Sequence, residues 1–304
     1  MIDNLKLLKY CSKNPEFFLD DIYMFVEKHK DLKKYAEITK EIKNTLIAIK
    51  EVKGKKDSLK IIDQLFEQLY KLMPKYSNNS EFGCFINACD SSLEEVLFDK
   101  NLLAKITYLY LEKRDLNDVV PIEWIQALID KRSATRKGNV GEKKLAGILE
   151  TKGYKLVKNI TEFKFIKKVF AKCSGKGDFS NKALKSHFGE SIGKNTQDKK
   201  LDLIIKKDRD IFFLEAKHMK TSGGEQNKQI LELIELLRNK PKRPNLHYVG
   251  FLDGIYFNKL FGAEKAANTE EYNKITHQKK DIGRILSKIK KNYFINTAGY
   301  KKLF

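Results

Sequence analysis

Apolar residues in the first part of the chain recur at the spacing of amphipathic helices. Segments 31–52 (DLKKYAEITKEIKNTLIAIKEV) and 58–73 (SLKIIDQLFEQLYKLM) place apolar side chains at i, i+3, i+4 and i+7, which is one face of a helix. Pro74 and the following YSNNSEFG interrupt this pattern, and Pro121 opens another predicted helix, as a proline at the first helical position can. The pattern predicts an all-helical region in which the stripes form the core.

Beyond residue 130, short apolar runs alternate with amphipathic stretches. The predicted strands are 154–160, 163–170, 201–205, 211–217 and 246–254, and the predicted helices start near Val140, near Glu225 and at Lys279. Between them, residues 171–200 are polar, rich in glycine and basic, and are predicted as a long functional loop. The order of helices and strands predicts an α/β fold with a mixed central sheet and flanking helices.

Charge and glycine usage change at the same place in the chain. Residues 1–130 contain 20 Lys/Arg and 22 Asp/Glu, a net charge of −2, whereas residues 131–304 contain 40 and 18, a net charge of +22. Only Gly54 and Gly83 of the 17 glycines precede residue 131. An A+T-rich coding sequence would raise the lysine content of both parts of the chain, so a uniform codon bias does not explain the difference in charge. We therefore expect a helical N-terminal domain over 1–130 and a basic α/β domain over 131–304.

Several classes of protein are excluded by the composition. The chain has no run of 18 apolar residues that could span a membrane, and its first residues lack the apolar core of a signal peptide. The four cysteines do not have the spacing of a zinc site, and we expect them to be reduced. These features predict a cytoplasmic protein.

The predicted hairpin carries ionisable residues in two strongly apolar runs, LDLII and IFFLEAK. If its turn is centred on Asp208 and Arg209 with an even number of loop residues, paired positions have residue numbers that sum to 417. Asp202 then lies directly opposite Glu215, with their Cβ atoms about 5 Å apart, and Lys217 shares their face because strand side chains alternate. A loop of odd length with a bulge would shift this register.

Two carboxylates placed opposite each other repel, so something must compensate their charge. Mg²⁺ does so well, because it prefers oxygen ligands and keeps several waters. The metal, the carboxylates and a nearby ammonium together suit the hydrolysis of a phosphoryl group. A strongly basic domain around such a site predicts a nucleic acid as the partner. The alternative is that Asp202 ends a strand and Glu215 and Lys217 form a surface ion pair.

The spacing LD-x₁₂-EAK on two adjacent strands followed by a helix resembles the active site of the PD-(D/E)xK nuclease superfamily. Leu201 stands where the superfamily normally has proline, which ligates no metal. The helix GNVGEKKLAGILETKGY resembles the first core helix of the superfamily, in which Glu142 matches an additional acid. Over residues 131–257 the arrangement is most similar to type II restriction endonucleases, in particular DpnII/MboI-like enzymes.

This resemblance implies a restriction-endonuclease-like core and a role for each residue. Asp202 and Glu215 would hold one or two Mg²⁺ ions, with Glu142 and the carbonyl of Ala216 as further ligands. Lys217 would orient or deprotonate the attacking water. The implied activity is Mg²⁺-dependent, sequence-specific hydrolysis of double-stranded DNA that leaves 5′-phosphates, carried out by a homodimer because a two-fold DNA site calls for two active sites.

The DNA contacts and the function leave alternatives open. By resemblance, the helix after the hairpin offers Gln226 or Gln229 near the scissile phosphate, and Asp178 or Asp198 are alternative metal ligands. Lysines of the basic loop are candidates for contacts to phosphates or bases, namely Lys176, Lys182, Lys185 and Lys194. A nuclease that reads DNA structure, such as a junction resolvase or repair enzyme, and a non-catalytic DNA-binding relative are the competing functions.

Overall fold

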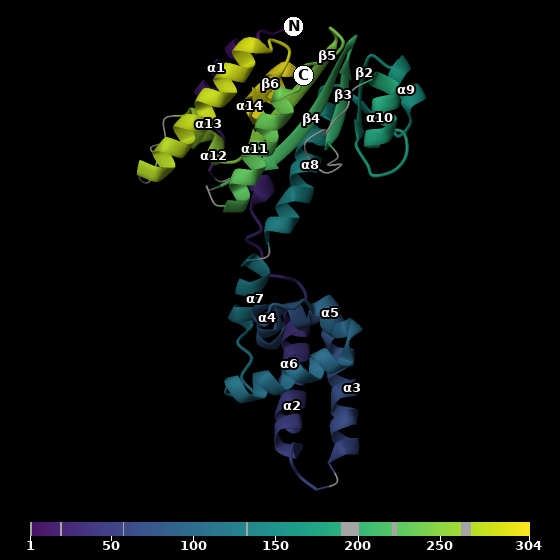
Figure 1. Cartoon of the computed structure of the whole chain (residues 1–304), viewed down its shortest axis with the longest axis vertical. Helices are drawn as coiled ribbons and strands as arrows, with labels where there is room; N and C mark the ends of the chain where they lie inside the picture. Colours follow the sequence, from purple (N-terminus) through teal and green to yellow (C-terminus); the bar gives the residue numbers. More distant parts are fainter. Residues whose placement is uncertain are drawn as a thin grey trace. The chain divides into compact units, whose positions relative to one another are not determined.

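The computed structural model divides the chain into two compact units (Figure 1). The sheet-bearing unit comprises Met1–Met24 and Thr135–Phe304, and the helical unit comprises Phe25–Ala134. The structure describes residues 2–18, 20–56, 58–131, 133–189, 201–220, 224–262 and 269–304, without the side chains of 75–77, 133–139, 224–226 and 269.

The helical unit is built from the predicted amphipathic stripes. Its elements are α2 (Leu32–Val52), α3 (Leu59–Tyr76), the 3₁₀ turn η2 (Ser77–Asn79), α4 (Glu81–Ala88), α5 (Leu93–Phe98), α6 (Lys100–Lys113) and α7 (Ile122–Lys131). Tyr110 is fully buried at the centre, where Phe82 and Phe85 approach its ring edge-on, each with centroids 5.1 Å away. Pro74 does not end α3, which continues beyond it to Tyr76.

The sheet-bearing unit holds one six-stranded mixed sheet, as predicted. Its strands are β1 (Lys155–Leu156), β2 (Lys168–Lys172), β3 (Leu203–Lys207), β4 (Asp210–His218), β5 (Leu246–Asp253) and β6 (Tyr293–Ile295). They lie side by side in chain order. The β2–β3 and β3–β4 pairs are antiparallel, whereas β1–β2, β4–β5 and β5–β6 are parallel.

Helices cover both faces of this sheet. They are α1 (Asn4–Lys13), α8 (Ser133–Thr151), α9 (Ile160–Phe165), α10 (Asn181–Phe188), α11 (Gly224–Arg238), α12 (Tyr256–Phe261), α13 (Thr269–Lys288) and α14 (Thr297–Leu303), with a 3₁₀ turn, η1 (Asp21–Tyr23). On one face, Phe251 packs against Tyr300 of α14, whose hydroxyl donates to the Leu145 carbonyl of α8. On the other face, Phe213 packs against Phe188 of α10, and α11 lies over β4 and β5 (Figure 1).

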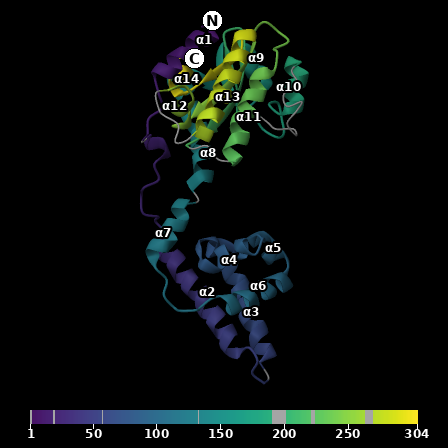
Figure 2. The ribbon, with the colours of Figure 1, turned by 60° about the vertical axis from the view of Figure 1, so that its left-hand side comes forward.

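The first 24 residues belong to the sheet-bearing unit, although the sequence led us to expect a helical domain over 1–130. Asn4 of α1 donates to the carbonyls of Leu286 and Asn292, at 2.9 and 3.0 Å. Gly299 of α14 is needed for the close approach of α1, because a Cβ there would collide with the Cys11 sulfur. The two ends of the chain therefore lie together, as Figure 2 shows for α1 and α14.

The β3–β4 hairpin has the predicted register. Leu203 pairs with Leu214 and Lys207 with Asp210, so that paired residue numbers sum to 417. The turn contains two residues, of which Asp208 takes a positive φ of 56°, a conformation that Asp tolerates better than most residues. An even loop without a bulge keeps the alternation of side chains unbroken along both strands.

Other local predictions were wrong. Residues 163–165 form the end of helix α9, not a strand, and Asn159 caps that helix by accepting from the Glu162 N–H. The stretch 171–200 contains helix α10 within its described part. Strand β6 and helix α14 follow the basic helix α13 at the end of the chain and were not predicted.

Candidate active site

Asp202 lies one residue before β3, at the end of the hairpin remote from its turn. Its backbone N–H donates to the Leu214 carbonyl at 3.1 Å, so Asp202 shares Leu214 with Leu203 and departs by one position from the register of the hairpin. Its carboxylate oxygen Oδ2 accepts from the Ala216 N–H at 2.7 Å. These two bonds hold the Asp202 carboxylate against β4 at Ala216, the residue between Glu215 and Lys217.

Glu215 and Lys217 project from the β4 face that α11 covers. The Glu215 side chain is buried, with 5% of the residue exposed. The Lys217 ammonium donates to Glu215 Oε1 at 2.6 Å, and only 15% of its side chain is exposed. The predicted alternative of a surface pair does not fit, because both side chains are shielded from water.

The partly buried Asp202 carboxyl lies close to the negative charge of Glu215. Burial and, next, the charge of Glu215 raise the pKa of Asp202 to about 7, against the opposing effects of the Ala216 N–H and Lys217. Two desolvated carboxylates that disfavour each other's charge form a donor set suited to a hard divalent cation. The residues present therefore fit the Mg²⁺ that the sequence predicts.

Glu232 is a member of this site that sequence reasoning missed. It lies on α11, and its carboxylate is 3.3 Å from the Lys217 ammonium. The side chain is 30% exposed. The ammonium thus lies between carboxylates from β4 and from α11. No local pattern in the sequence marks Glu232, because its proximity depends on how α11 packs on the sheet.

Glu142 lies on α8 and forms an ion pair with Lys172 of β2, at 3.4 Å. Its charge also contributes to the raised pKa of Asp202. Among the described residues, no group of three or more His, Cys, Asp or Glu side chains is close enough together to hold a metal ion. In this structure Asp202 and Glu215 form a pair, and Glu142 stands apart from it.

The remaining predicted contacts are spread over several elements. Gln229 lies on α11, one turn before Glu232, and the side chain of Gln226 lies outside the described residues. Lys182 and Lys185 are exposed on α10, and Lys176 is exposed in the preceding turn. Lys194 and Asp198 both lie outside the described residues.

Asp178, predicted above as an alternative metal ligand, and His218 both have structural partners. Asp178 accepts from the Ile160 N–H at 2.8 Å, which fixes the start of α9. His218, next to Lys217 on β4, faces the opposite side of the sheet and stacks on Tyr23 with centroids 4.0 Å apart. Neither side chain therefore joins the Asp202–Glu215 pair.

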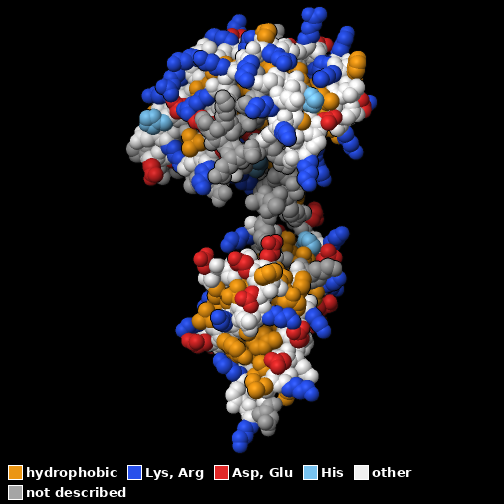
Figure 3. Space-filling view, turned by 45° about the vertical axis from the view of Figure 1, so that its right-hand side comes forward, with side chains coloured by type: hydrophobic (Ala, Val, Ile, Leu, Met, Phe, Trp, Pro, Cys, Tyr) orange, Lys and Arg blue, Asp and Glu red, His pale blue; other side chains and the backbone are white. Residues whose placement is uncertain are grey.

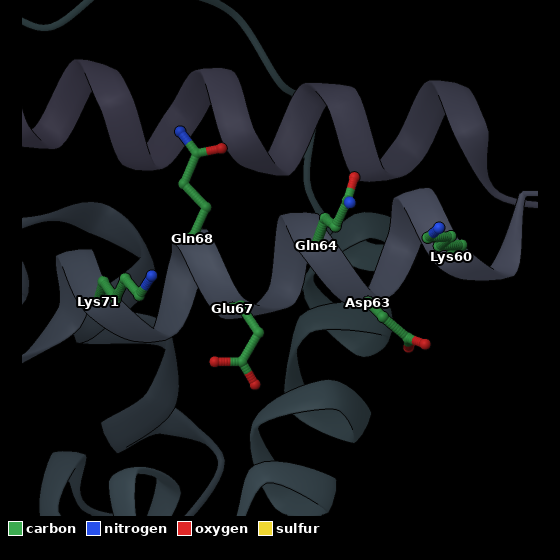
Figure 4. A pocket seen from close by; sticks show the side chains of 6 residues that line it. All are labelled: Lys60, Asp63, Gln64, Glu67, Gln68 and Lys71. Carbon is green, nitrogen blue, oxygen red and sulfur yellow. The ribbon is translucent and has the colours of Figure 1, made fainter.

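The helical unit offers a hollow without comparable chemistry. It has a volume of about 460 Å³ and lies along one side of α3 (Figure 4). All six lining side chains come from that helix, namely Lys60, Asp63, Gln64, Glu67, Gln68 and Lys71. Glu67 is paired with Lys100 and is about half exposed. This is a solvated helix face, and we assign it no chemistry.

Charge separates the two units sharply. The sheet-bearing unit has 41 Lys/Arg and 22 Asp/Glu, a net charge of +19, whereas the helical unit has 19 and 18, a net charge of +1. On the face shown in Figure 3, Lys and Arg side chains crowd the sheet-bearing unit. The paired carboxylates thus lie in a unit that attracts polyanions.

Comparison with known proteins identifies a family over part of the chain. Residues 136–279 match the family model described as DpnII restriction endonuclease. The match includes Glu142 and the whole hairpin with Asp202, Glu215 and Lys217. No curated protein matches the chain. None of the helices in the described ranges is long and apolar enough to cross a membrane.

Proposed function

We propose that this chain is a type II restriction endonuclease, because residues 136–279 match the DpnII restriction endonuclease family model. It hydrolyses phosphodiester bonds of double-stranded DNA at a specific sequence, depends on Mg²⁺ and leaves 5′-phosphates. The observation that carries the proposal is the cluster at the open end of the β3–β4 hairpin, where Asp202 accepts from the Ala216 N–H and the buried Glu215 lies 2.6 Å from the Lys217 ammonium.

Asp202 and Glu215 would hold Mg²⁺, with the Ala216 carbonyl and Glu142 as further candidate ligands. The metal, when bound, supplies an acidic water and stabilises negative charge on the phosphoryl oxygens. Asp202 is positioned for this role by the Ala216 N–H, and Glu215 by its place inside β4. Because Asp202 is partly buried beside the buried Glu215, a bound cation would offset their negative charge and stabilise the folded site.

Lys217 would orient the attacking water and help to remove its proton. The structure supports this role by holding the ammonium within reach of the same carboxylates, 2.6 Å from Glu215. A partly buried lysine loses little side-chain freedom on catalysis, since it is already held in place. Its second partner, Glu232, would keep it oriented when Glu215 is engaged with metal.

The DNA is held, in this proposal, by the basic surface of the sheet-bearing unit. Lys176, Lys182 and Lys185 are exposed and available to phosphates, and we keep Gln226, Gln229 and Lys194 as further candidates. The enzyme acts as a homodimer in the cytoplasm, because a two-fold DNA sequence is cut on both strands by two symmetry-related active sites.

The experiment that tests this function is digestion of unmethylated plasmid and phage DNA with the purified protein and Mg²⁺. Lanes with EDTA and with Glu215→Ala are the controls. We expect discrete fragments that vanish in both control lanes, and sequencing of their ends identifies the recognition site. Cleavage of branched DNA alone would instead favour a structure-selective nuclease. DNA binding without any cleavage would favour a non-catalytic relative.

A further inference from the structure

Residues 14–24 lie outside the family match, yet they are fixed to the sheet-bearing unit at both ends. At one end, Asn258 of α12 donates to the Glu16 carbonyl and accepts from the Glu16 N–H, both at 2.8 Å. The Glu16 carboxylate accepts from the Thr297 N–H at 2.6 Å. Glu16 is only 6% exposed. The anchor of this segment is therefore specific and buried.

The other end is held by a second buried network. The Tyr23 hydroxyl donates to Asp253 at 2.5 Å, and the Tyr23 ring stacks on His218. Lys144 of α8 donates to Asp20 at 2.7 Å and to Asp253 at 3.0 Å. Burial opposes the charged form of Lys144, but Asp253 and Asp20 outweigh it and raise its pKa. The segment between the two anchors is thus held against the unit.

Two adjacent phenylalanines project from the segment between these anchors. Phe17 is 80% exposed and Phe18 is 67% exposed. A single exposed apolar side chain needs no explanation, but a fixed aromatic pair beside a hollow marks a binding surface. Figure 2 shows the N-terminal chain descending along the sheet-bearing unit after α1.

The hollow beside this pair is here called the aromatic cleft. Its lining includes Phe17, Phe18, Asp20, Tyr23, His218 and Lys220, and its volume is about 190 Å³. That is less than the roughly 300–1,000 Å³ typical of small-molecule sites, so it suits one planar ring system. Gly254 fixes its floor, because a Cβ at that position would lie 2.5 Å from the Met219 carbonyl.

The aromatic cleft lies at the same end of the sheet as the catalytic pair. His218 directly follows Lys217 in β4, and Lys220 is three residues from Lys217, which limits their Cα separation to about 10 Å. Asp202 lies at this end as well, since β3 starts where antiparallel β4 ends. The cleft opens on the other face of the sheet, to which His218 points, so DNA bound at this end of the sheet reaches it around the ends of β4 and β5.

We propose that Phe17, Phe18 and the aromatic cleft contact the bases of the DNA being cut, and that the cleft receives one base displaced from its stack. The inference rests on the proposed nuclease function. Aromatic side chains stack on any displaced base. Asp20, whose side chain is 26% exposed, offers an acceptor to an exocyclic amino group, which favours adenine, cytosine or guanine over thymine.

DNA is the occupant that the charges favour. The unit that carries the cleft has a net charge of +19, and Lys220 lies in the lining. Lys144 offsets the charge of Asp20 and Asp253 at the base of the cleft. A second copy of the chain is the competing occupant, and the test below separates the two.

The test compares Phe17→Ala/Phe18→Ala with the matched control Phe165→Ala. Phe165 is 83% exposed on the same unit, but it lies at the opposite end of the strands, near the start of β2 and the hairpin turn. Binding is measured in an Asp202→Asn background, with duplexes that carry the recognition site and the fluorescent base 2-aminopurine at each position in turn. Cleavage rates are measured without that background.

We expect the parent and Phe165→Ala to raise 2-aminopurine fluorescence at one position, which reports unstacking of that base. The double variant should lose this signal and bind DNA about 5- to 100-fold more weakly. Phe17→Trp and Phe18→Trp, which keep an aromatic ring, should retain binding. The thermal midpoint of the double variant should match the parent, since both side chains are exposed.

Two results would overturn the inference without touching the nuclease function. One is a double variant that binds, cuts and unstacks DNA as Phe165→Ala does. The other is a double variant that loses self-association in sedimentation while the fluorescence signal persists, which would assign the surface to a second copy. A parent that cuts no DNA would instead remove the proposed function, and this inference with it.

Discussion

The two units of this protein differ in what they bury. In the described part of the helical unit, every buried polar residue is uncharged, for example Thr39, Asn79 and Thr107. The sheet-bearing unit buries carboxylates, including Glu16, Glu215 and Asp253. A buried charge costs stability unless it is paired, so its presence points to a function or to a specific anchor. The buried carboxylates, and with them the candidate active site, belong to the sheet-bearing unit.

The exposed surfaces of the two units differ in net charge. The helical unit is nearly neutral, with a net charge of +1. The sheet-bearing unit carries almost the whole net charge of the chain. Matched substitutions in the two units therefore separate effects on DNA chemistry from effects on folding.

The largest difference is expected for the paired carboxylates. Asp202→Asn and Glu215→Gln should each lower the rate of Mg²⁺-dependent cleavage by roughly 10³-fold or more, because the metal loses a ligand. Thermal stability without metal should stay the same or rise for Asp202→Asn, which removes one of two like charges, but fall for Glu215→Gln, which also takes a buried partner from Lys217. Single-turnover cleavage and calorimetry measure the two effects.

Glu67→Gln is the control in the helical unit, because Glu67 lies in the hollow of α3 and about half of its side chain is exposed. Its cleavage rate should equal that of the parent. Equal losses in all three variants would mean that the comparison between units is wrong.

A smaller loss is expected for Glu232→Gln. Without this carboxylate, Lys217 keeps Glu215 as a partner but loses its tie to α11, so its orientation is less fixed. Loss of such a supporting contact typically costs about 10- to 100-fold. The turnover number should fall while the Michaelis constant for DNA stays unchanged.

Glu235→Gln is the matched control on the same helix, because Glu235 pairs with Arg238 at the surface. It should behave as the parent. An unchanged turnover number in Glu232→Gln would show that Lys217 needs no support from α11.

Next in size is the effect of surface lysines on DNA affinity. Lys182→Ala/Lys185→Ala on α10 should reduce the slope of log affinity against log salt by about 2, since each phosphate contact contributes roughly 0.9. Lys60→Ala/Lys71→Ala on α3 of the helical unit should leave the slope unchanged. Binding titrations between low and moderate salt measure it, and equal slopes in both variants would contradict our placement of the DNA.

The smallest effect on activity is expected for Glu16→Gln, which tests the anchor of the N-terminal segment. Burial and, next, the charge of Asp253 raise the pKa of Glu16 from 4.5 to about 7. The folded state therefore binds more protons than the unfolded state in this range. Stability from this group is present below pH 4.5 and is lost as the pH rises through 7.

The unfolding free energy of the parent should decrease as the pH rises from 4.5 to about 7. In Glu16→Gln this decrease should be smaller by about 1–3 kcal/mol. Denaturant titrations of parent and variant at pH 5 and pH 8 provide the measurement. Asp202 contributes equally to the pH dependence of unfolding free energy in the parent and in Glu16→Gln. The difference between the two proteins is therefore due to Glu16. The two proteins having the same pH dependence would show that Glu16 is not the titrating group.

The sequence by itself determined the features that depend on short-range periodicity. Side chains alternate along a strand, so the spacing predicts Asp202, Glu215 and Lys217 on one face if the turn has an even number of residues, and the structure has a turn of two residues. The mixed sheet and the helical stripes followed from the same kind of pattern. The division of charge near residue 130 required only counting.

Tertiary structure decided whatever depends on contacts between distant segments. The alternating FKF of 163–165 suggested a strand, but the cap at Asn159 and the burial of Phe163 against α10 made it helical. Glu232 meets Lys217 only because of the way α11 lies on β4. Glu16 reaches Thr297 across 281 positions of sequence. Such contacts depend on which faces pack together, and no local pattern records that choice.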